Sequence, residues 1–345
     1  MHSAERGMTG SKMLNRYGRW PLALLLASLL AACGGDPHGD PVRFTVPAGA
    51  GLSAVTDTLA RRDIIEWPVL FRVYTQAKGF ARSLKPGVYE LQAGTAWSDI
   101  LEKLVSGDIV RESLVIPEGW TAAQIGERIA AMAGVPADSV VPLLLDSTEA
   151  SARTVPGPTL EGYLYPATYI LPVGTSAREA IDVLVARYRQ VWTPELRAIA
   201  DSAGLSEREV VTLASIVEKE AKRWTERDTI AGVYRNRLRI GMPLQADPTV
   251  QYALGAHQRR LLYSHIRDVA DNPYNTYTHA GLPPGPIASP SEGSIRAVLS
   301  PADVPYLYFV ARPDGSHEFT RSLAEHNTAK NRIRRATTEG ATNSR

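Results

Sequence analysis

The clearest periodic pattern in the chain lies between residues 206 and 252. Ser206 and Glu209 have the S-x-x-E spacing of a capping box, which predicts the start of a helix. At about 100° per residue, one arc of this helix is apolar. The apolar arc contains Val210, Leu213, Ile216, Val217 and Ala221. The opposite, polar side contains Thr212, Ser215 and Lys219. The pattern therefore predicts an amphipathic helix with one face in the core.

Two glutamates near the end of this helix do not fit a simple amphipathic pattern. Glu220 falls inside the apolar arc, one turn after Ile216 and Val217, and Glu218 falls at its edge. A carboxylate on a buried helix face is costly unless it is paired or protonated, and a protonated one can act as a general acid. Three interpretations stay open: a salt bridge to a nearby arginine, a helix-end side chain that reaches water, or a catalytic acid. The pattern alone favours the two structural interpretations.

Residues 42–112 are predicted to form a small α+β module. Strand patterns occupy residues 42–46 and 88–91, and helical patterns occupy residues 52–62, 68–77 and 97–105. Together with the phrase LKPGVY at residues 84–89, this order resembles a LysM-like glycan-binding module. Small βααβ units are common, however, and most of them bind nothing.

Residues 113–333 are predicted to form a mixed, helix-rich catalytic domain, so that the fold class of the whole chain is α+β. After the central helix, a second helix is expected at residues 224–239 and a third at residues 290–299. Between them, residues 271–290 are rich in Pro and Gly, and a loop of this length usually carries function. Strands at residues 306–311 and 317–320 flank the turn Asp314-Gly315. The polar tail, residues 334–345, is predicted to be disordered.

The N-terminus has the pattern of a targeting segment. Basic residues precede an apolar run at residues 20–32, which is short for a membrane span and typical of a signal peptide. The phrase LAAC at residues 30–33 resembles the lipobox of bacterial lipoproteins, in which the cysteine, here Cys33, carries the lipid. The alternative is an uncleaved signal anchor. Residues 1–32 are therefore predicted to be a signal peptide or anchor and residues 33–41 a linker, with the body of the protein outside the cytoplasm.

Composition and motifs exclude several kinds of chemistry. The 345 residues are 44% hydrophobic and 21% charged, as in ordinary globular proteins, and a net charge of +2 gives no case for nucleic-acid binding. The single cysteine excludes an intramolecular disulfide, and the scattered histidines form no H-E-x-x-H motif. No G-x-S-x-G elbow or nucleotide-binding glycine motif is present in a suitable setting. We therefore expect no metal and no cofactor, and the remaining chemistry is carboxylate chemistry on a glycan or a similar polar polymer.

Eight phrases along the chain resemble, in order, the signature of the YceG-like family of endolytic murein transglycosylases. They are LASIVEKE at residues 213–220, ERD at 226–228, NRLRIGM at 236–242, LQADPTV at 244–250, YNTY at 274–277, GLPPGPI at 281–287, YLYFVA at 306–311 and EHN at 325–327. The resemblance implies cleavage of the β-1,4 bond between N-acetylmuramic acid and N-acetylglucosamine in nascent peptidoglycan. The product is a 1,6-anhydro end, which forms when the muramoyl C6 hydroxyl attacks C1 within the same sugar. In the family the catalytic acid is the second Glu of the V-E-K-E phrase, here Glu220, and the helical projection independently prefers Glu220 to Glu218.

Further residues are candidates for supporting or substrate-binding roles. They are Glu218, Gln245, Asn275 and Tyr277. Gln245 could bond the acid or an N-acetyl group, or cap a loop, and Asn275 and Tyr277 could line a groove or form a turn around Pro273. Asp247 is predicted to cap a helix. Arg237 is a candidate ion-pair partner of Glu218.

The chain departs from the family pattern at two places, and two other functions stay open. The apolar run ends at Cys33 where family members usually carry a transmembrane helix, and Ala167 stands where the family often has Asp. A muramidase would need a second carboxylate ~5–10 Å from Glu220, with Glu226 or Asp247 as candidates. The other alternative is a non-catalytic glycan-binding lipoprotein. The expected partners are peptidoglycan glycan strands and a membrane, with peptidoglycan synthases as further candidates. The expected location is the cell envelope, with an anchor in the inner membrane and the body in the periplasm.

Overall fold

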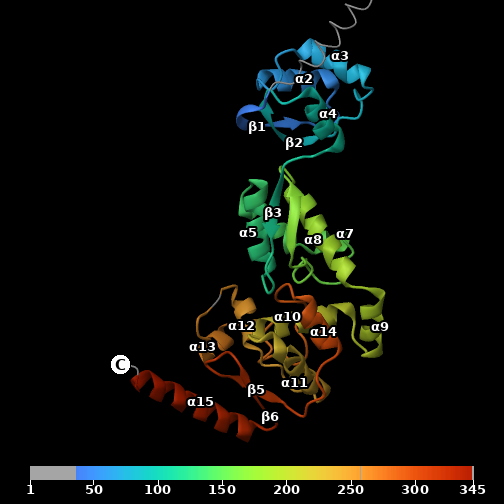
Figure 1. Cartoon of the computed structure of the whole chain (residues 1–345). Helices are drawn as coiled ribbons and strands as arrows, with labels where there is room; N and C mark the ends of the chain where they lie inside the picture. The colour runs from blue at the N-terminus through green and yellow to red at the C-terminus, as the bar shows by residue number, and fades with distance from the viewer. Residues whose placement is uncertain (1–35, 257, 344–345) are drawn as a thin grey trace, which may run out of the picture. The chain divides into compact units, whose positions relative to one another are not determined.

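The computed structural model describes residues 36–256 and 258–343. The chain divides into two compact units, residues 1–112 with 172–174 and residues 113–171 with 175–345. Both contain helices and small two-stranded sheets (Figure 1). The predicted α+β fold class is therefore confirmed at this level.

In the first unit, two antiparallel strands pack against helices. The elements are β1 (His38–Val46), α2 (Leu52–Arg61), α3 (Pro68–Ala77), β2 (Gly87–Ala93) and α4 (Trp97–Ser106). The register pairs Phe44 with Tyr89 and Val42 with Leu91, and alternation along the strands turns Phe44, Tyr89 and Leu91 into the core. The predicted linker, residues 33–41, is shorter than expected, because β1 begins at His38, which pairs with Ala93. The predicted Cys33 lipid site and the anchor at residues 1–32 lie outside the described residues.

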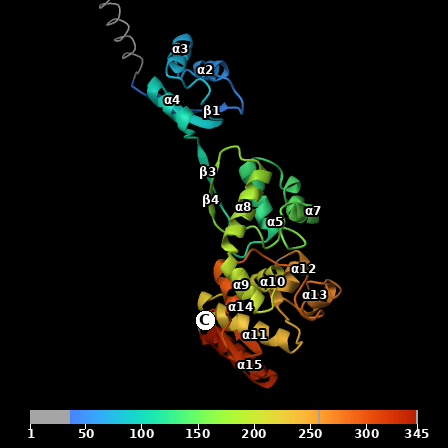
Figure 2. The same cartoon turned by 90° about the vertical axis from the view of Figure 1, so that its right-hand side faces the viewer.

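The second unit begins with a core of helices beside a two-stranded sheet. Strands β3 (Arg111–Val115) and β4 (Thr168–Pro172) pair with each other. Figure 2 shows α5 (Ala122–Ala133) and α8 (Ala177–Val191) on the same side of this pair. Capping boxes at Thr121 and Ser176 start the two helices. The short elements between them are η1 (Ala137–Ser139), α6 (Val141–Leu144) and α7 (Ser147–Ala152). Ala167, the departure from the family phrase, packs against this core.

The rest of the second unit is built around α10 (Glu207–Glu220), which packs on α11 (Arg227–Arg239), α12 (Asp247–Leu254) and α14 (Glu292–Leu299) (Figure 1). The capping box of Ser206 and Glu209 is present, as predicted. The other elements are α9 (Pro194–Ser202), η2 (Trp224–Glu226), α13 (Tyr263–Asp268), β5 (Tyr308–Ala311), β6 (His317–Thr320) and α15 (Leu323–Asn343). Strands β5 and β6 form the predicted hairpin, with Tyr308 opposite Thr320.

Two features of this region differ from the sequence expectations. The polar side of α10 is solvent-exposed only at Lys219, near the end of the helix, because Thr212 and Ser215 are both buried. Ser215 donates to the carbonyl of Thr212 and accepts from the backbone N–H of Ile287, so the Pro- and Gly-rich segment covers this side of the helix. In addition, α15 continues to Asn343, through residues for which the composition predicts disorder.

Candidate active site

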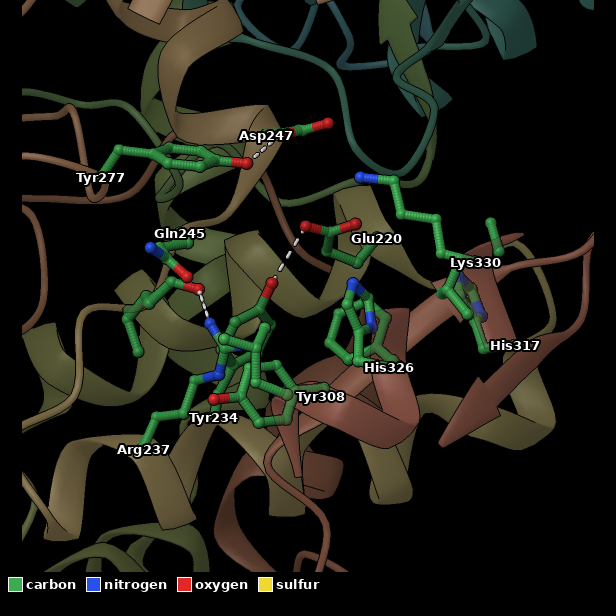
Figure 3. Close-up of a pocket in the computed structure, with 15 residues that line it drawn as sticks. Glu220, Tyr234, Arg237, Gln245, Asp247, Tyr277, Tyr308, His317, His326 and Lys330 are labelled. Carbon is green, nitrogen blue, oxygen red and sulfur yellow. Dashed lines mark hydrogen bonds between the residues drawn. The ribbon is translucent and has the colours of Figure 1, made fainter. Parts of the chain in front are cut away.

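A cavity of about 340 Å³ opens at the C-terminal end of α10. This volume is that of a small-molecule site. Figure 3 shows Tyr277 and Asp247 on one side of Glu220, and His326, His317 and Lys330 on the other. The lining residues come from α10, α11, the start of α12, the β5–β6 hairpin and α15, so segments that are far apart in the sequence form one site.

Glu220 is the last residue of α10 and its side chain lines the cavity. Its Oε1 accepts a hydrogen bond of 2.9 Å from the hydroxyl of Tyr234 on α11. Burial raises the pKa of the carboxyl to about 7, and the charge of Asp247 acts in the same direction, while the Tyr234 hydroxyl and Arg237 oppose the rise. In the described part of the chain, no basic side chain forms an ion pair with Glu220. A salt-bridged structural role is therefore excluded there, and the carboxyl can hold or release a proton near neutral pH.

Glu218 is held in a different environment, two residues earlier on the same helix. One of its oxygens accepts from Arg227 at 2.9 Å, and the other accepts from the Ser291 backbone, the Ser291 hydroxyl and the Ser294 hydroxyl. These bonds tie α10 to the start of α11 and to the cap of α14 and give Glu218 a structural position outside the cavity. The predicted pairing with Arg237 is wrong, and Arg227 takes that place.

Arg237 instead bonds the backbone of the segments that line the cavity. Its guanidinium donates to the carbonyls of Leu307, Pro243 and Leu244, and it lies 5.1 Å from the ring centroid of Tyr308. These bonds join α11 to the start of β5 and to the loop that precedes α12. Arg237 therefore holds together two segments that line the cavity.

Gln245 and Tyr277 both line the cavity, as expected for supporting residues. Gln245 has a φ of +49°, a left-handed conformation that is uncommon for a residue with a Cβ and is often found at functional sites. Tyr277 donates a hydrogen bond of 2.5 Å to Asp247. Asp247 therefore does not cap α12 through its side chain. The N-cap is Ala246, and the Asp247 carboxylate faces the cavity.

Asn275 does not line the cavity. It is buried, and its side-chain amide donates to the carbonyls of Ile266 and Val269, while its Oδ1 accepts from the backbone of Tyr277. This is the turn role set out above as the alternative to groove lining, and it holds the segment that carries Tyr277.

The sequence pattern did not identify several residues of the site. Tyr234 supplies the hydrogen bond to Glu220. His317 lines the cavity with its Nδ1 2.7 Å from Glu226 Oε2, and its backbone N–H donates to the same carboxylate. His326 also lines the cavity and has a buried Nδ1 without a hydrogen-bond partner, and burial lowers its pKa. The EHN phrase at residues 325–327 pointed to His326 but not to a role.

A second carboxyl with a raised pKa lies outside the cavity. Glu161 is buried, and both of its oxygens accept from the backbone N–H of Ala122, the first residue of α5. Burial raises its pKa to about 7. It is not among the residues that line the cavity.

The arrangement defines the class of site. One carboxyl that titrates near neutral pH lies between the aromatic side chains of Tyr277, Tyr308 and Phe309, which provide surfaces for sugar rings. No cluster of three or more possible metal ligands occurs within the described ranges. A half-buried acid in an aromatic-walled cavity is suited to protonating a glycosidic oxygen.

Comparisons with known proteins place the chain in a family. The sequence matches the YceG-like family over residues 44–332, and the chain belongs to this family. A Bacillus subtilis (strain 168) protein named endolytic murein transglycosylase is 34% identical over 307 residues, which cover 84% of each chain. A protein of the same name from Streptococcus pneumoniae serotype 2 is 31% identical over 328 residues, which cover 84% of this chain and 59% of that one.

A solved structure supports the same assignment. A crystal structure of a yceG-like protein from Listeria monocytogenes aligns with a TM-score of 0.59 at 33% identity, and it covers 85% of this chain and 100% of that one. The family predicted from the eight phrases is therefore confirmed. For the predicted membrane association there is one structural finding: among residues 36–256 and 258–343, no helix is both long and apolar enough to cross a bilayer.

Proposed function

We propose that this protein is a peptidoglycan lytic transglycosylase that cleaves the bond between N-acetylmuramic acid and N-acetylglucosamine within glycan strands. The relatives named endolytic murein transglycosylases support the reaction class. The observation that carries the proposal for this chain is the state of Glu220. It is a cavity-facing carboxyl with a pKa of about 7 and a hydrogen bond from Tyr234.

In this mechanism Glu220 acts twice. The protonated carboxyl first donates its proton to the glycosidic oxygen as the bond to C1 breaks, and the N-acetylglucosamine end leaves with a free hydroxyl. The resulting carboxylate then accepts the proton of the muramoyl C6 hydroxyl while the C6 oxygen bonds to C1 of the same sugar. Glu220 regains its proton, no water is consumed, and a 1,6-anhydro end remains. A pKa near the working pH suits both steps, because the group must give and take a proton in turn.

Gln245 and Tyr277 are proposed to position the substrate. Both line the cavity beside Glu220, and Gln245 presents an amide that can bond an N-acetyl group. We further propose that Cys33 or the apolar run before it tethers the protein to the inner membrane, with the body in the periplasm. There, cleavage of nascent strands would terminate their elongation near the synthases. We also propose that residues 38–106 form a LysM-like module, which the order of their strands and helices supports.

Product analysis in heavy-oxygen water tests the reaction. The purified chain is incubated with peptidoglycan, and the muramic ends are analysed by mass spectrometry. We expect anhydro ends without heavy oxygen, and Glu220→Gln should lower the rate by at least ~10²-fold with unchanged circular dichroism. Unchanged glycan with the folded wild-type chain would instead indicate a binding protein without activity.

A hydrolase is the second candidate, because Asp247 brings another carboxylate into the same cavity. Glu226, the other candidate for a second carboxylate, is already bonded to His317. A muramidase would use Asp247 as nucleophile or base, and its reducing ends would carry heavy oxygen. The same mass spectra therefore separate the two reactions.

A further inference from the structure

Helix α3 of the first unit has apolar side chains on its outer face as well as on its inner face. Phe71 and Thr75 point into the core and are fully buried. On the outside, the exposed fractions are 61% for Trp67, 62% for Val69, 51% for Leu70, 57% for Val73 and 39% for Phe80. We call these five residues the α3 outer face. Val69, Leu70 and Val73 lie on the helix itself, Trp67 is its N-cap, and Phe80 follows its C-terminal end. Single exposed apolar residues are normal, but several along one helix and at its ends mark a surface that is covered by something else.

An open groove of about 390 Å³ continues this surface. Its apolar lining consists of Tyr74, Phe80, Leu101 and Val105. Its polar lining consists of Lys78 and of Ser98, Glu102 and Ser106 on α4, so that one basic and one acidic side chain are present. A glycan site needs many placed hydrogen-bond donors and acceptors, because each sugar hydroxyl loses its bonds to water on binding. This groove is better suited to hydrocarbon than to a sugar.

The segment that carries the α3 outer face is strongly basic. Between residues 61 and 85 there are six basic residues and two acidic ones, a net charge of +4 in a chain whose total is +2. The basic residues are Arg61, Arg62, Arg72, Lys78, Arg82 and Lys85. Within the described residues, none of the six forms an ion pair. A segment that combines exposed apolar side chains with basic ones free of ion pairs matches the chemistry of an anionic lipid surface, with a hydrocarbon layer beneath phosphate groups.

The place where the chain enters the first unit is connected to α3 through the start of α4. His38 pairs with Ala93, next to the start of α4, and the Trp97 ring of α4 packs against Phe71 and Tyr74 of α3 at 5.6 and 5.8 Å between ring centroids. Only four residues lie between Cys33 and His38, so the start of β1 lies within ~18 Å of the predicted anchor point. So short a tether keeps the first unit near the membrane at an effective concentration in the millimolar range. At this concentration even a weak affinity of the α3 outer face for lipid keeps it bound to the membrane.

We propose that the α3 outer face lies in the headgroup region of an anionic bilayer, so that the first unit rests on the membrane to which the chain is tethered. Trp67, Val69 and Val73 enter the boundary between headgroups and acyl chains, and the surrounding basic side chains bond lipid phosphates. This inference rests on the membrane tether of the proposed function but not on the transglycosylase reaction.

Photo-crosslinking of the full chain in bacterial cells tests the occupant. Val69 is replaced by benzoylphenylalanine, and adducts are identified by mass spectrometry. The matched control is Thr45, which is exposed on β1 and alternates with the buried Phe44 and Val46, so it lies on the opposite side of the sheet from the core. We expect phospholipid adducts at position 69 and at least ~5-fold fewer at position 45. A factor of ~5 is the change in binding expected from one basic side chain near an anionic surface.

Charge reversal tests the role of the basic residues. The full chain is reconstituted into vesicles of phosphatidylethanolamine and phosphatidylglycerol. There, Lys78→Glu should lower the lipid-adduct yield at position 69 by ~5-fold or more. Neutral phosphatidylcholine vesicles should give a similar loss. Equal yields in the two kinds of vesicle would overturn the electrostatic part of the proposal.

The remaining outcomes distinguish this inference from the proposed function. A membrane-bound chain whose Val69 adducts are peptidoglycan or protein would overturn the inference and leave the tether intact. A chain recovered free of membranes and without lipid adducts would overturn both. The lipid adducts should persist in Glu220→Gln, because the surface does not depend on catalysis.

Discussion

Replacing Glu220 with glutamine is expected to remove a pH-dependent cost to the stability of the fold. The pKa of this carboxyl rises from its ordinary value of 4.5 to about 7 in the folded protein, mainly through burial. Between these values the folded protein retains a proton that the unfolded chain has released. The free energy of unfolding of the wild type therefore falls as the pH rises through this window.

The size of the effect follows from the shift. At ~1.36 kcal/mol for each pH unit, the rise from 4.5 to about 7 corresponds to a cost of ~3 kcal/mol above pH 7. This is an upper limit, because Glu220 faces an open cavity in which water stabilises the carboxylate. Glutamine keeps the shape and can still accept the hydrogen bond from Tyr234, but it does not ionise. The variant should match the wild type below pH 4.5 and be more stable by up to ~3 kcal/mol above pH 7.

Urea unfolding of both proteins at a series of pH values from 4 to 8 measures this difference. Glu161 also has a pKa of about 7, and its titration affects both proteins equally, so the difference between the two curves isolates Glu220. If the free energies of unfolding of the wild type and the variant differ by the same amount at every pH, the pKa of Glu220 is not raised. A variant that is much less stable at neutral pH would show that the carboxylate is paired, and would refute its assignment as an acid poised near pH 7.

Three further predictions concern other residues of the second unit. Glu218→Gln should lower the free energy of unfolding by up to ~3 kcal/mol at neutral pH, because the partly buried Arg227 guanidinium keeps only its longer ion pair with the exposed Glu118, at 3.5 Å. A loss confined to activity would contradict this structural role. Asp247→Asn should lower the Glu220 pKa and move the alkaline limit of activity on glycan strands to lower pH, and an unmoved limit would contradict the coupling. Gly162→Ala should lower the melting temperature, with a cost of ~2 kcal/mol or more. The reason is that Gly162 has φ +83° and an added Cβ would lie 2.4 Å from Pro286 Cβ, so a melting temperature equal to that of the wild type would contradict it.

Most of the local structure follows from short-range patterns in the amino-acid sequence. The capping box at Ser206 and the periodic helices and strands appear as predicted, because their signals involve residues only a few positions apart. The sequence also placed Glu220, and not Glu218, on the inner arc of α10, since helical geometry alone sets that direction. The family could also be predicted, because its motifs are short stretches of sequence.

The surroundings of these residues, in contrast, depend on how the folded elements pack. Glu218 pairs with Arg227 rather than Arg237. Thr212 and Ser215 on the polar side of α10 are buried, because a distant Pro- and Gly-rich segment packs on this side of the helix. Tyr234 became the partner of Glu220 through the packing of α11 against α10. These outcomes depend on contacts between segments that are separated along the chain, and their energies come from burial and pairing that no local pattern records. For the same reason the pKa of Glu220 belongs to the folded protein, because the carboxyl loses much of its water only when the walls of the cavity assemble around it.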